Sequence, residues 1–456
     1  MNHSVAPIGV IGLGRSGAAA VTFLSGHAIP TIAWDAQSAP ALALTHLPHV
    51  ETWSGNLPVH AFSTCQAILL SPGIPRTLPD LAKLLADGIP IINDIEWLYR
   101  HVQETAKPDP PFIGVTGSNG KSTVTTLIGD MLQQHGLAVG IGGNLGTPAL
   151  SLWDPAHQAY VLELSSFQLE SIARFHPRIA LLLNLTPDHM DRYPTLGAYL
   201  EAKRRIFQNA APGDTAIINA DDPLLASTSA QLTAMGVTVI PFSIEHPIAG
   251  GVYACEGILT DHRHTSPQPL MELDQIRIRG LHNQANAAAA AAAALAAGAS
   301  TQAVVATLKQ FPGLPHRMEW IRTIKGVDYY NDSKGTNVGA TLMSLQSFAT
   351  PQQPGSIILI AGGRDKKGDF STLAPVAAQC VTDAILLGEA AEDLALAFAG
   401  GPRLHRVANM TSAVKLAHQL AQPTQTVLLS PACASFDMFK NFEDRGDRFR
   451  EAVHGL

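Results

Sequence analysis

The residues GVTGSNGKST, Gly114 to Thr123, follow the apolar run PFIGV and lead into a helical pattern. Glycines and small side chains between a strand and a helix let backbone N–H groups approach phosphate oxygens, and the helix dipole adds a favourable potential. The spacing departs from G-x-x-x-x-G-K-[ST] at its first position, where Val115 stands and glycines flank it at 114 and 117. We interpret the stretch as a variant phosphate-binding loop between a strand and a helix.

Two side chains of this loop have expected roles. Lys121 would supply positive charge to the β- and γ-phosphates of ATP, and the Ser122 hydroxyl would reach Mg²⁺. The loop residues predicted to bind ATP are Gly117, Ser118, Asn119, Gly120, Lys121, Ser122 and Thr123.

Polar side chains that follow two later apolar runs are candidate partners of the same metal. YVLELSSFQLE places Glu163 at the end of a strand-like run, where a neighbouring strand could aim it at the metal; the alternative is a helix-cap partner. LLLNLTPDHMDRY repeats the arrangement with Asp188, His189 and Asp191. In the amphipathic helix YLEAKRRIF, Lys203 by itself indicates only a solvated or snorkelling side chain.

The chain divides into segments that each begin with a short apolar strand and continue into a helical pattern. Such alternation indicates parallel α/β sheets, and 456 residues exceed one ordinary core. The proline-rich ETAKPDPP and QFPGLPHRMEW stretches separate the segments, and the alanine run of HNQANAAAAAAAALAAG predicts a packed helix. We therefore predict an α/β protein with domains at residues 1–108, 109–312 and 313–456.

Composition excludes several classes of protein. A net charge of −7 gives no bulk attraction to nucleic acid, and an uninterrupted apolar run of membrane-spanning length is missing from the sequence. The four cysteines are widely spaced, without a CxxC pair, which favours a reduced compartment. We expect a cytoplasmic monomer that acts on small molecules and binds neither nucleic acid nor membrane.

The N-terminal segment carries a second glycine-rich turn. Gly12, Gly14 and Gly17 form G-x-G-x-x-G after a strand, and Asp35 follows about twenty residues later. This pattern alone suggests NAD(P) binding, so a dinucleotide-dependent oxidoreductase is one alternative, and a non-catalytic nucleotide-binding module is another. The oxidoreductase leaves the phosphate loop, Glu163, His189 and the NDSKGTN stretch without a task, and a non-catalytic binder would not need a complete set of metal ligands.

Taken in order, the motifs of the chain resemble those of the Mur ligase family of peptidoglycan precursor synthesis. The motifs are GLGRSG, SPGIP, NDIEW, GVTGSNGKST, GGNLG, LELSSFQLE, LNLTPDHMDRY, AKRRIF, GLHNQANAAAA, GLPHRMEW, NDSKGTN and LLSPACASFDMFKNFEDRG. The resemblance implies a Rossmann-like first domain that binds a UDP-sugar, a P-loop ATPase-like middle domain, and a Rossmann-like third domain that binds the incoming amino acid.

The resemblance also implies roles for individual residues. In the middle domain Glu163 would join Ser122 as a metal ligand, and His189 would hold a second Mg²⁺ with Lys203 as a carbamate, which replaces the solvated interpretation of that lysine. Lys121, His189 and Lys203 would be catalytic. The UDP-substrate residues would be Gly14, Arg15, Ser16, Asp35, Ser71, Pro72, Gly73 and Asn144. The further ATP residues would be Asn283, Asn286, Arg317 and Asp332, with His282 shaping the same pocket. The amino-acid acceptor residues would be Lys334, Thr336, Lys366, Ser435, Phe436 and Phe442.

The implied activity is an ATP-dependent amide ligase that works through an acyl phosphate. The C-terminal motifs favour D-glutamate as acceptor and UDP-N-acetylmuramoyl-L-alanine as donor, while another acceptor within the family, or a folylpolyglutamate synthetase, is the alternative. Lys367 stands where glycine is common after the preceding lysine, so either lysine can face the acceptor. Gly335 replaces the alanine usual in the NDSKATN motif of this branch.

Overall fold

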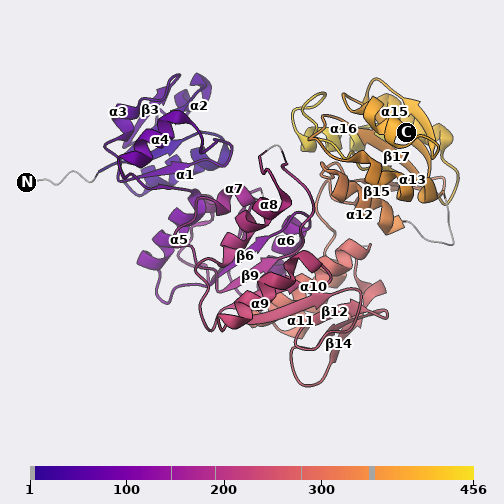
Figure 1. Ribbon diagram of the computed structural model, residues 1–456, viewed down its shortest axis with the longest axis horizontal. Helices are drawn as coiled ribbons and strands as arrows, with labels where there is room; N and C mark the ends of the chain where they lie inside the picture. Colours follow the sequence, from indigo (N-terminus) through magenta and orange to yellow (C-terminus); the bar gives the residue numbers. More distant parts are fainter. Residues whose placement is uncertain (1–5, 145, 191, 279, 349–354) are drawn as a thin grey trace, which may run out of the picture.

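The computed structural model describes residues 6–144, 146–190, 192–278, 280–348 and 355–456. Within these residues the strands form three separate sheets, each accompanied by helices. Figure 1 shows the part built on the middle sheet lying between the N-terminal and C-terminal parts. The predicted class, α/β with three sheet-bearing domains, is therefore confirmed.

The first sheet is parallel and has the strand order β3-β2-β1-β4-β5. Its first strand pairs with β2 on one side and β4 on the other, so the strand order reverses at β1. Open α/β sheets commonly bind ligands beyond the carboxyl ends of the strands at such a reversal. The elements are β1 (Ile8–Ile11), α1 (Arg15–Gly26), β2 (Thr31–Asp35), α2 (Ser38–Leu42), β3 (Val50–Ser54), α3 (Val59–Phe62), β4 (Ala67–Leu70), α4 (Pro79–Ala86) and β5 (Ile91–Ile92).

The middle sheet has the order β14-β13-β12-β11-β10-β9-β6-β8-β7. Its helices and 3-10 turns are α5 (Asp94–Thr105), α6 (Lys121–Gln134), η1 (Ala149–Leu152), α7 (Ser166–Leu169), α8 (Leu196–Arg204), η2 (Arg205–Phe207), η3 (Pro223–Leu225), α9 (Ala226–Ala234), η4 (Leu273–Gln275), α10 (Leu281–Ala296) and α11 (Thr301–Gln310). Its strands are β6 (Phe112–Thr116), β7 (Val139–Gly143), β8 (Ala159–Glu163), β9 (Ile179–Leu182), β10 (Thr215–Asn219), β11 (Thr238–Ser243), β12 (Val252–Cys255), β13 (Ile258–Asp261) and β14 (Gln268–Glu272).

Strands β12 to β14 pair antiparallel, which departs from the predicted parallel pattern. The reason is the connection of Glu256 and Gly257 between β12 and β13, which is too short for the crossover that a parallel pair requires. The alanine run behaves as predicted, because α10 packs against α6 and Ala287 to Ala294 are fully buried.

The third sheet has the order β15-β16-β20-β17-β18-β19, with β15 antiparallel to β16 and the other pairs parallel. Its elements are β15 (Glu319–Ile324), β16 (Val327–Asn331), α12 (Val338–Phe348), β17 (Ile357–Gly362), η5 (Phe370–Leu373), α13 (Ala374–Cys380), β18 (Val381–Leu387), α14 (Ala391–Ala397), β19 (Arg403–Arg406), α15 (Met410–Leu420), β20 (Thr426–Leu429) and α16 (Phe442–His454).

The first two sheets share part of one hydrophobic core. Ile8 of β1, Leu98 of α5 and Phe112 of β6 belong to the same buried cluster, so α5 packs between the two domains. In the described residues no helix is both long and apolar enough to cross a bilayer.

Candidate functional site

The phosphate loop lies between β6 and α6, as the sequence predicts. Gly120 precedes α6 with φ of +82°, and a Cβ added there would collide with the side-chain oxygen of Asn286, so glycine is required at this position. The amide of Ser118 donates to the Asn184 carbonyl at 3.0 Å. The Asn184 side chain in turn accepts from the Asn119 amide at 2.8 Å. The end of β9 therefore fixes the shape of the loop.

Two lysines meet at one carbonyl oxygen of this loop. Lys121 Nζ donates to the carbonyls of Gly117 and Ser118, both at 2.8 Å. Lys203 Nζ, from α8, donates to the same Gly117 oxygen at 2.7 Å and lies 4.3 Å from the centre of the Tyr199 ring. Burial lowers the pKa of both lysines, and the pKa of Lys203 lies well below its ordinary value. Lys203 is 1% exposed, which contradicts a solvated surface lysine.

Glu163, at the end of β8, is the buried carboxylate of the site. It accepts from Ser122 Oγ at 2.5 Å and from Asn144 Nδ2 at 2.7 Å. Burial opposes its ionisation, but the charges of Lys121 and Arg317 together with these two hydrogen bonds outweigh burial, and the pKa of Glu163 falls below its usual value. The alternative interpretation as a helix cap does not hold, because the side chain of Ser165 caps α7. A charged carboxylate thus lies directly beside the phosphate loop.

The third domain reaches the loop through Arg317. Its Nη2 donates to Ser122 Oγ at 2.5 Å, so Ser122 contacts both Glu163 and a residue that precedes β15. Arg317 lies close in sequence to Met318, whose amide donates to Asp332 Oδ1 at 3.3 Å. The predicted pair Arg317 and Asp332 is therefore brought to the nucleotide loop from the other side.

A second interdomain contact surrounds Asp188. Its Oδ2 accepts from Asn337 Nδ2 at 3.1 Å, and its Oδ1 lies 3.8 Å from Lys366 Nζ. The neighbouring His189 has Nε2 3.6 Å from the Asp188 carboxylate and packs edge-on against Phe167. Asp191 lies outside the described residues. Asp188, from the polar cluster predicted after β9, thus faces Asn337 and Lys366 of the third domain.

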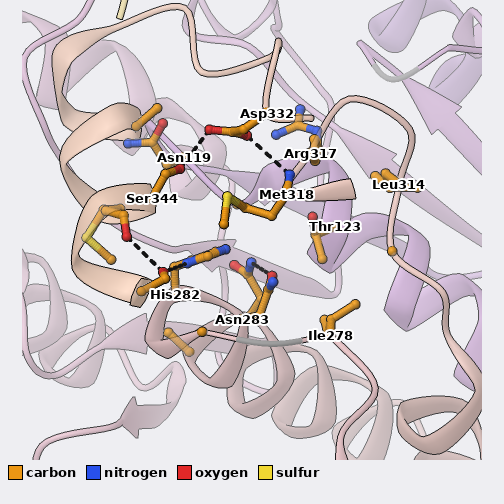
Figure 2. Close-up of a pocket in the computed structure, with 18 of the residues that line it drawn as sticks. Asn119, Thr123, Ile278, His282, Asn283, Leu314, Arg317, Met318, Asp332 and Ser344 are labelled. Atoms are coloured by element: carbon orange, nitrogen blue, oxygen red, sulfur yellow. Dashed lines mark hydrogen bonds between the residues drawn. The ribbon is translucent and has the colours of Figure 1, made fainter. Parts of the chain in front are cut away.

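Between the middle and third domains lies a cavity of about 990 Å³. Figure 2 shows Asp332 and Arg317 at one end of this cavity and His282 and Asn283 at the other. Asp332 is buried and accepts from Ser344 and Ser430 at 2.7 and 2.9 Å, and burial raises its pKa to about 6. The cavity is lined by predicted ATP residues, namely Asn119, Gly120, Thr123, Asn283, Asn286, Arg317 and Asp332.

Contacts join two pairs of the predicted acceptor residues in the third domain. Lys334 Nζ lies 3.7 Å from the centre of the Phe442 ring, and burial lowers its pKa to about 8. Lys366 Nζ donates to Thr336 Oγ1 at 3.4 Å, whereas Lys367 is exposed. Of the two lysines that the sequence left open, Lys366 is the one that faces the middle domain. Ser435 is buried, whereas the next residue, Phe436, is exposed.

The first domain contributes a separate set of predicted residues. Asp35 Oδ2 accepts from the Leu13 amide at 2.7 Å, and Ser71 Oγ donates to the Gly12 carbonyl at 2.6 Å, so both side chains hold the glycine-rich turn. Gly14 is exposed and a Cβ there would meet nothing, which leaves its backbone open to a ligand. Ser16 and Pro72 are partly exposed, and Gly73 is exposed.

Two predicted UDP-substrate residues contact the middle domain instead of lying at the glycine-rich turn alone. Arg15 donates a hydrogen bond to the Gly146 carbonyl of the middle domain. Asn144 lies in the middle domain against Glu163 rather than at the turn around Gly12. The structure thus groups Asn144 with the phosphate loop.

Sequence reasoning missed several residues that shape the site. Asn184 holds the phosphate loop through the Asn119 amide, and Asn337 donates to Asp188. Ser347 of the third domain forms a hydrogen bond with His282 of the middle domain. Asn184 had a usable signal, since it is a polar residue directly after an apolar strand next to β6. The other two contacts join residues more than sixty positions apart, and no spacing in the sequence indicates them.

The fold and the site define a three-domain α/β protein whose nucleotide loop is covered by its third domain. Family models describe the same division: a Mur ligase MurD-like N-terminal domain matches residues 6–93, a Mur ligase middle domain matches residues 115–294, and a Mur ligase glutamate ligase domain matches residues 316–433.

Whole-length relatives agree with these models. The UDP-N-acetylmuramoylalanine–D-glutamate ligase of Geotalea uraniireducens (strain Rf4) is 39% identical over 454 residues, covering 98% of this chain and 97% of the relative. The enzyme of the same name from Pseudomonas savastanoi pv. phaseolicola (strain 1448A / Race 6) is 42% identical over 451 residues, covering 98% and 97%. The MurF ligase from Thermotoga maritima, solved in complex with ADP, shares the fold with a TM-score of 0.59 at 18% identity, covering 87% of this chain and 91% of that one. The chain belongs to the Mur ligase family, and the predicted resemblance is confirmed.

Proposed function

We propose that this chain is an ATP-dependent amide ligase that joins D-glutamate to UDP-N-acetylmuramoyl-L-alanine and releases ADP and phosphate. The relatives that carry this activity in their names match nearly the whole chain. The structural observation that carries the proposal is Ser122, held between Glu163 of the middle domain and Arg317 of the third domain. Such a junction couples nucleotide binding to the domain that would bring the amino acid.

In the first step, a carboxylate oxygen of the donor's L-alanine attacks the γ-phosphorus of ATP. The bond from phosphorus to the β,γ-bridging oxygen breaks, ADP leaves, and an acyl phosphate forms. Lys121 and Arg317 supply positive charge where negative charge gathers in the transition state. For this step Lys121 must leave the carbonyls of Gly117 and Ser118 and turn toward the phosphates, which are stronger acceptors.

In the second step, the amine of D-glutamate attacks the acyl carbon. The carbon–oxygen bond to phosphate breaks after a tetrahedral intermediate, the amine loses a proton, and the amide and inorganic phosphate are released. The acceptor carries two carboxylates, so it needs cations and hydrogen-bond donors. Lys334, Thr336 and Lys366 supply these on one edge of the third domain, and Ser435, Phe436 and Phe442 complete the proposed pocket.

Closure of the third domain would also protect the acyl phosphate from water. An acyl phosphate hydrolyses in water, so the third domain has to cover it until the amine attacks. The contacts of Arg317 with Ser122 and of Asn337 with Asp188 hold the third domain against the middle one. The first domain presents the backbone of its glycine-rich turn, near Gly14, to the UDP pyrophosphate.

The residues at the phosphate loop fit Mg²⁺, which favours oxygen ligands. Ser122 and Glu163 offer a hydroxyl and a carboxylate for one ion, and His189 would hold a second ion together with Lys203. A lysine ammonium has donors and no acceptor, and Mg²⁺ prefers oxygen to a neutral amine nitrogen, so Lys203 would serve as a ligand in the form of its carbamate. Bound Mg²⁺ would neutralise charge on the phosphate oxygens. We further propose that the enzyme acts as a monomer in the cytoplasm.

Phosphate release from ATP tests the proposal. With UDP-N-acetylmuramoyl-L-alanine as donor, we expect release with D-glutamate and none with L-glutamate, L-alanine, meso-diaminopimelate or L-lysine. Phosphate release with a different amino acid would show that this amino acid, and not D-glutamate, is the acceptor. A lack of release with every acceptor on this donor would contradict the proposed donor and redirect the search to a folate or a longer UDP-peptide.

A further inference from the structure

His189 has a backbone conformation that its surroundings must hold in place. Its φ of +57° lies in the left-handed region, which is uncommon for residues other than glycine. A residue keeps such a conformation only where the structure around it determines it, and such residues cluster at functional sites. The His189 carbonyl accepts hydrogen bonds from the amides of Arg192 and Tyr193, both at 2.9 Å. The position of His189 therefore depends on what holds these two residues.

One carboxylate holds the side chains of both residues. Glu170 Oε2 accepts from Arg192 Nη2 at 2.5 Å, and Glu170 Oε1 accepts from the Tyr193 hydroxyl at 2.6 Å. Hydrogen bonds in which one group is ionised are shorter and stronger than those between neutral groups. Because each carboxylate oxygen takes one of the two partners, Glu170 fixes Arg192 and Tyr193 together.

The same arginine also supports the ring of His189, through Phe167. The guanidinium carbon of Arg192 lies 4.1 Å from the centre of the Phe167 ring. This ring meets the His189 imidazole edge-on, with the two ring centres 4.9 Å apart. Cation–π and edge-to-face contacts both favour particular arrangements of the rings. Glu170 thus supports the backbone of His189 through two amides and its imidazole through Phe167.

Glu170 itself stands on a turn that other parts of the chain fix. The turn directly follows α7, and Arg205 Nε of η2 donates to the Leu169 carbonyl at 2.7 Å. Arg76 of the first domain donates from Nη1 to Ser171 Oγ at 2.7 Å. The residues on both sides of Glu170 are therefore tied down. The carboxylate is the fixed point, and the segment that carries His189 is held against it.

We propose that Glu170 is a positioning residue that holds His189, through Arg192 and Tyr193, where the imidazole can bind a metal ion. Partners outside the ligand shell commonly orient metal-binding histidines, and their loss costs about ten- to a hundredfold in metal affinity or activity. Glu170 is not one of the proposed metal ligands and acts through its neighbours. This inference rests on the proposed function in that His189 receives Mg²⁺.

The first measurement follows the His189 ring in the full chain without metal. Histidine labelled with ¹³C at Cε1 gives an NMR signal for each ring, and His189→Gln identifies the signal by its loss. We expect the His189 signal to move in Glu170→Ala, because the imidazole is released from its contact with Phe167. An unchanged His189 signal in Glu170→Ala would overturn the proposal.

Glu201→Ala is the matched control. Glu201 lies on α8, is well exposed, and forms an ion pair with Arg204 at 2.8 Å, so its loss also removes a carboxylate from an arginine. We expect the His189 signal to stay in place in this variant. Equal changes in the two variants would count against the proposal, since the effect would then not belong to Glu170.

The second measurement is the binding of Mn²⁺, as a paramagnetic substitute for Mg²⁺, to the full chain in the presence of ADP. Electron paramagnetic resonance measures the unbound ion. We expect Mn²⁺ to bind about tenfold or more weakly to Glu170→Ala and with unchanged affinity to Glu201→Ala. Glu170→Gln keeps one acceptor oxygen of the two, so its loss of affinity should lie between. A moved His189 signal with unchanged Mn²⁺ binding would contradict a role in metal binding.

Tyr193→Phe keeps the proposal testable if Glu170→Ala does not fold. This variant removes only the hydroxyl that Glu170 accepts from and leaves the aromatic ring in place. We expect a smaller effect in the same direction, with Mn²⁺ bound about two- to tenfold more weakly. If neither the His189 signal nor the Mn²⁺ affinity changes in Tyr193→Phe, the hydroxyl does not help to position His189 and the proposal is wrong.

The outcome is separable from the proposed ligase activity. If the His189 signal and the Mn²⁺ affinity change as expected but no acceptor supports phosphate release, the ligase proposal fails and the role of Glu170 stands. If D-glutamate supports phosphate release and Mn²⁺ binds equally to Glu170→Ala and Glu201→Ala, the ligase proposal stands and the role of Glu170 is refuted.

Discussion

Lys121 and Lys203 place their ammonium groups on the same carbonyl oxygen of Gly117, although they come from α6 and α8. Like charges this close repel each other, which adds to burial in lowering the pKa of Lys203. The arrangement suits an anion-binding loop, because phosphate oxygens are stronger acceptors than the backbone carbonyls that Lys121 now contacts. The two lysines thus have different expected roles, and removing each should have a different effect.

Lys121→Ala should reduce turnover by at least about a hundredfold, because it removes charge that stabilises the γ-phosphate in the transition state. Binding of the UDP-substrate should stay within about twofold of the unmodified protein, since the turn at Gly14 belongs to another domain. Calorimetry with the UDP-substrate and a phosphate-release assay measure the two effects. Loss of UDP-substrate binding in this variant would show that the division of labour between domains is wrong.

Lys203→Ala should be inactive, and short carboxylates such as formate or acetate should restore part of the activity. The reason is that a free carboxylate can occupy the place of the lysine carbamate as an oxygen ligand. Lys121→Ala serves as the control, because a carboxylate cannot replace a cation and should give no rescue there. Full activity of Lys203→Ala without any added carboxylate would contradict a ligand role.

At the scale of single elements, the sequence predicted the strand, loop and helix from β6 to α6 and the packed alanine helix α10. Both have local signals: glycine spacing in the first and a long run of one strong helix former in the second. The burial of Lys203 had no such signal, because exposure of a lysine on a helix depends on which parts of the chain cover it. The bond from His282 to Ser347 likewise depends on how two domains meet, which no local pattern encodes.

Helix α16 anchors the proposed acceptor pocket through Arg445. This arginine is 1% exposed and donates from Nη1 to the carbonyls of Cys433 and Ala434 at 3.1 and 3.3 Å. It also donates from Nη2 to the Ser333 carbonyl at 2.8 Å. One side chain therefore ties α16 to the segments that precede Lys334 and Ser435.

Arg445→Ala should lower the free energy of unfolding of the third domain by about 3–5 kcal/mol, because several buried carbonyls lose a charged donor. The KM for the amino acid should rise as the pocket loosens. Arg448→Ala on the same helix is the matched control, since Arg448 is well exposed and its loss should cost no more than about 0.5 kcal/mol. Calorimetric unfolding compares the two, and equal stability of both variants would rule out the anchoring role.

At the scale of the whole molecule, polar pairs join the third domain to the middle one. Asp188 receives Asn337 and faces Lys366 from the third domain, and Ser122 receives Arg317. Interfaces between domains of one chain usually permit relative motion, so each of these contacts should matter for the resting arrangement. The family fold and the order of the domains follow from the sequence, whereas the degree of closure depends on these pairs.

Asp188→Ala should increase the radius of gyration of the ligand-free protein, because it removes the partner of both Asn337 and Lys366. Small-angle X-ray scattering measures this change. Lys367→Ala is the control, since Lys367 is exposed beside Lys366 and its loss should leave the scattering curve unchanged. Identical curves for Asp188→Ala and the unmodified protein would show that Asp188 does not hold the domains together.

The central claim is that ATP activates the donor carboxylate as an acyl phosphate before the amine attacks. The most direct test uses UDP-N-acetylmuramoyl-L-alanine with ¹⁸O in the alanine carboxylate, together with ATP and D-glutamate. In the proposed sequence of bonds, the oxygen that attacks phosphorus leaves with the phosphate, so each phosphate released should carry one ¹⁸O from the donor. Amide formation with unlabelled phosphate would contradict the acyl-phosphate mechanism.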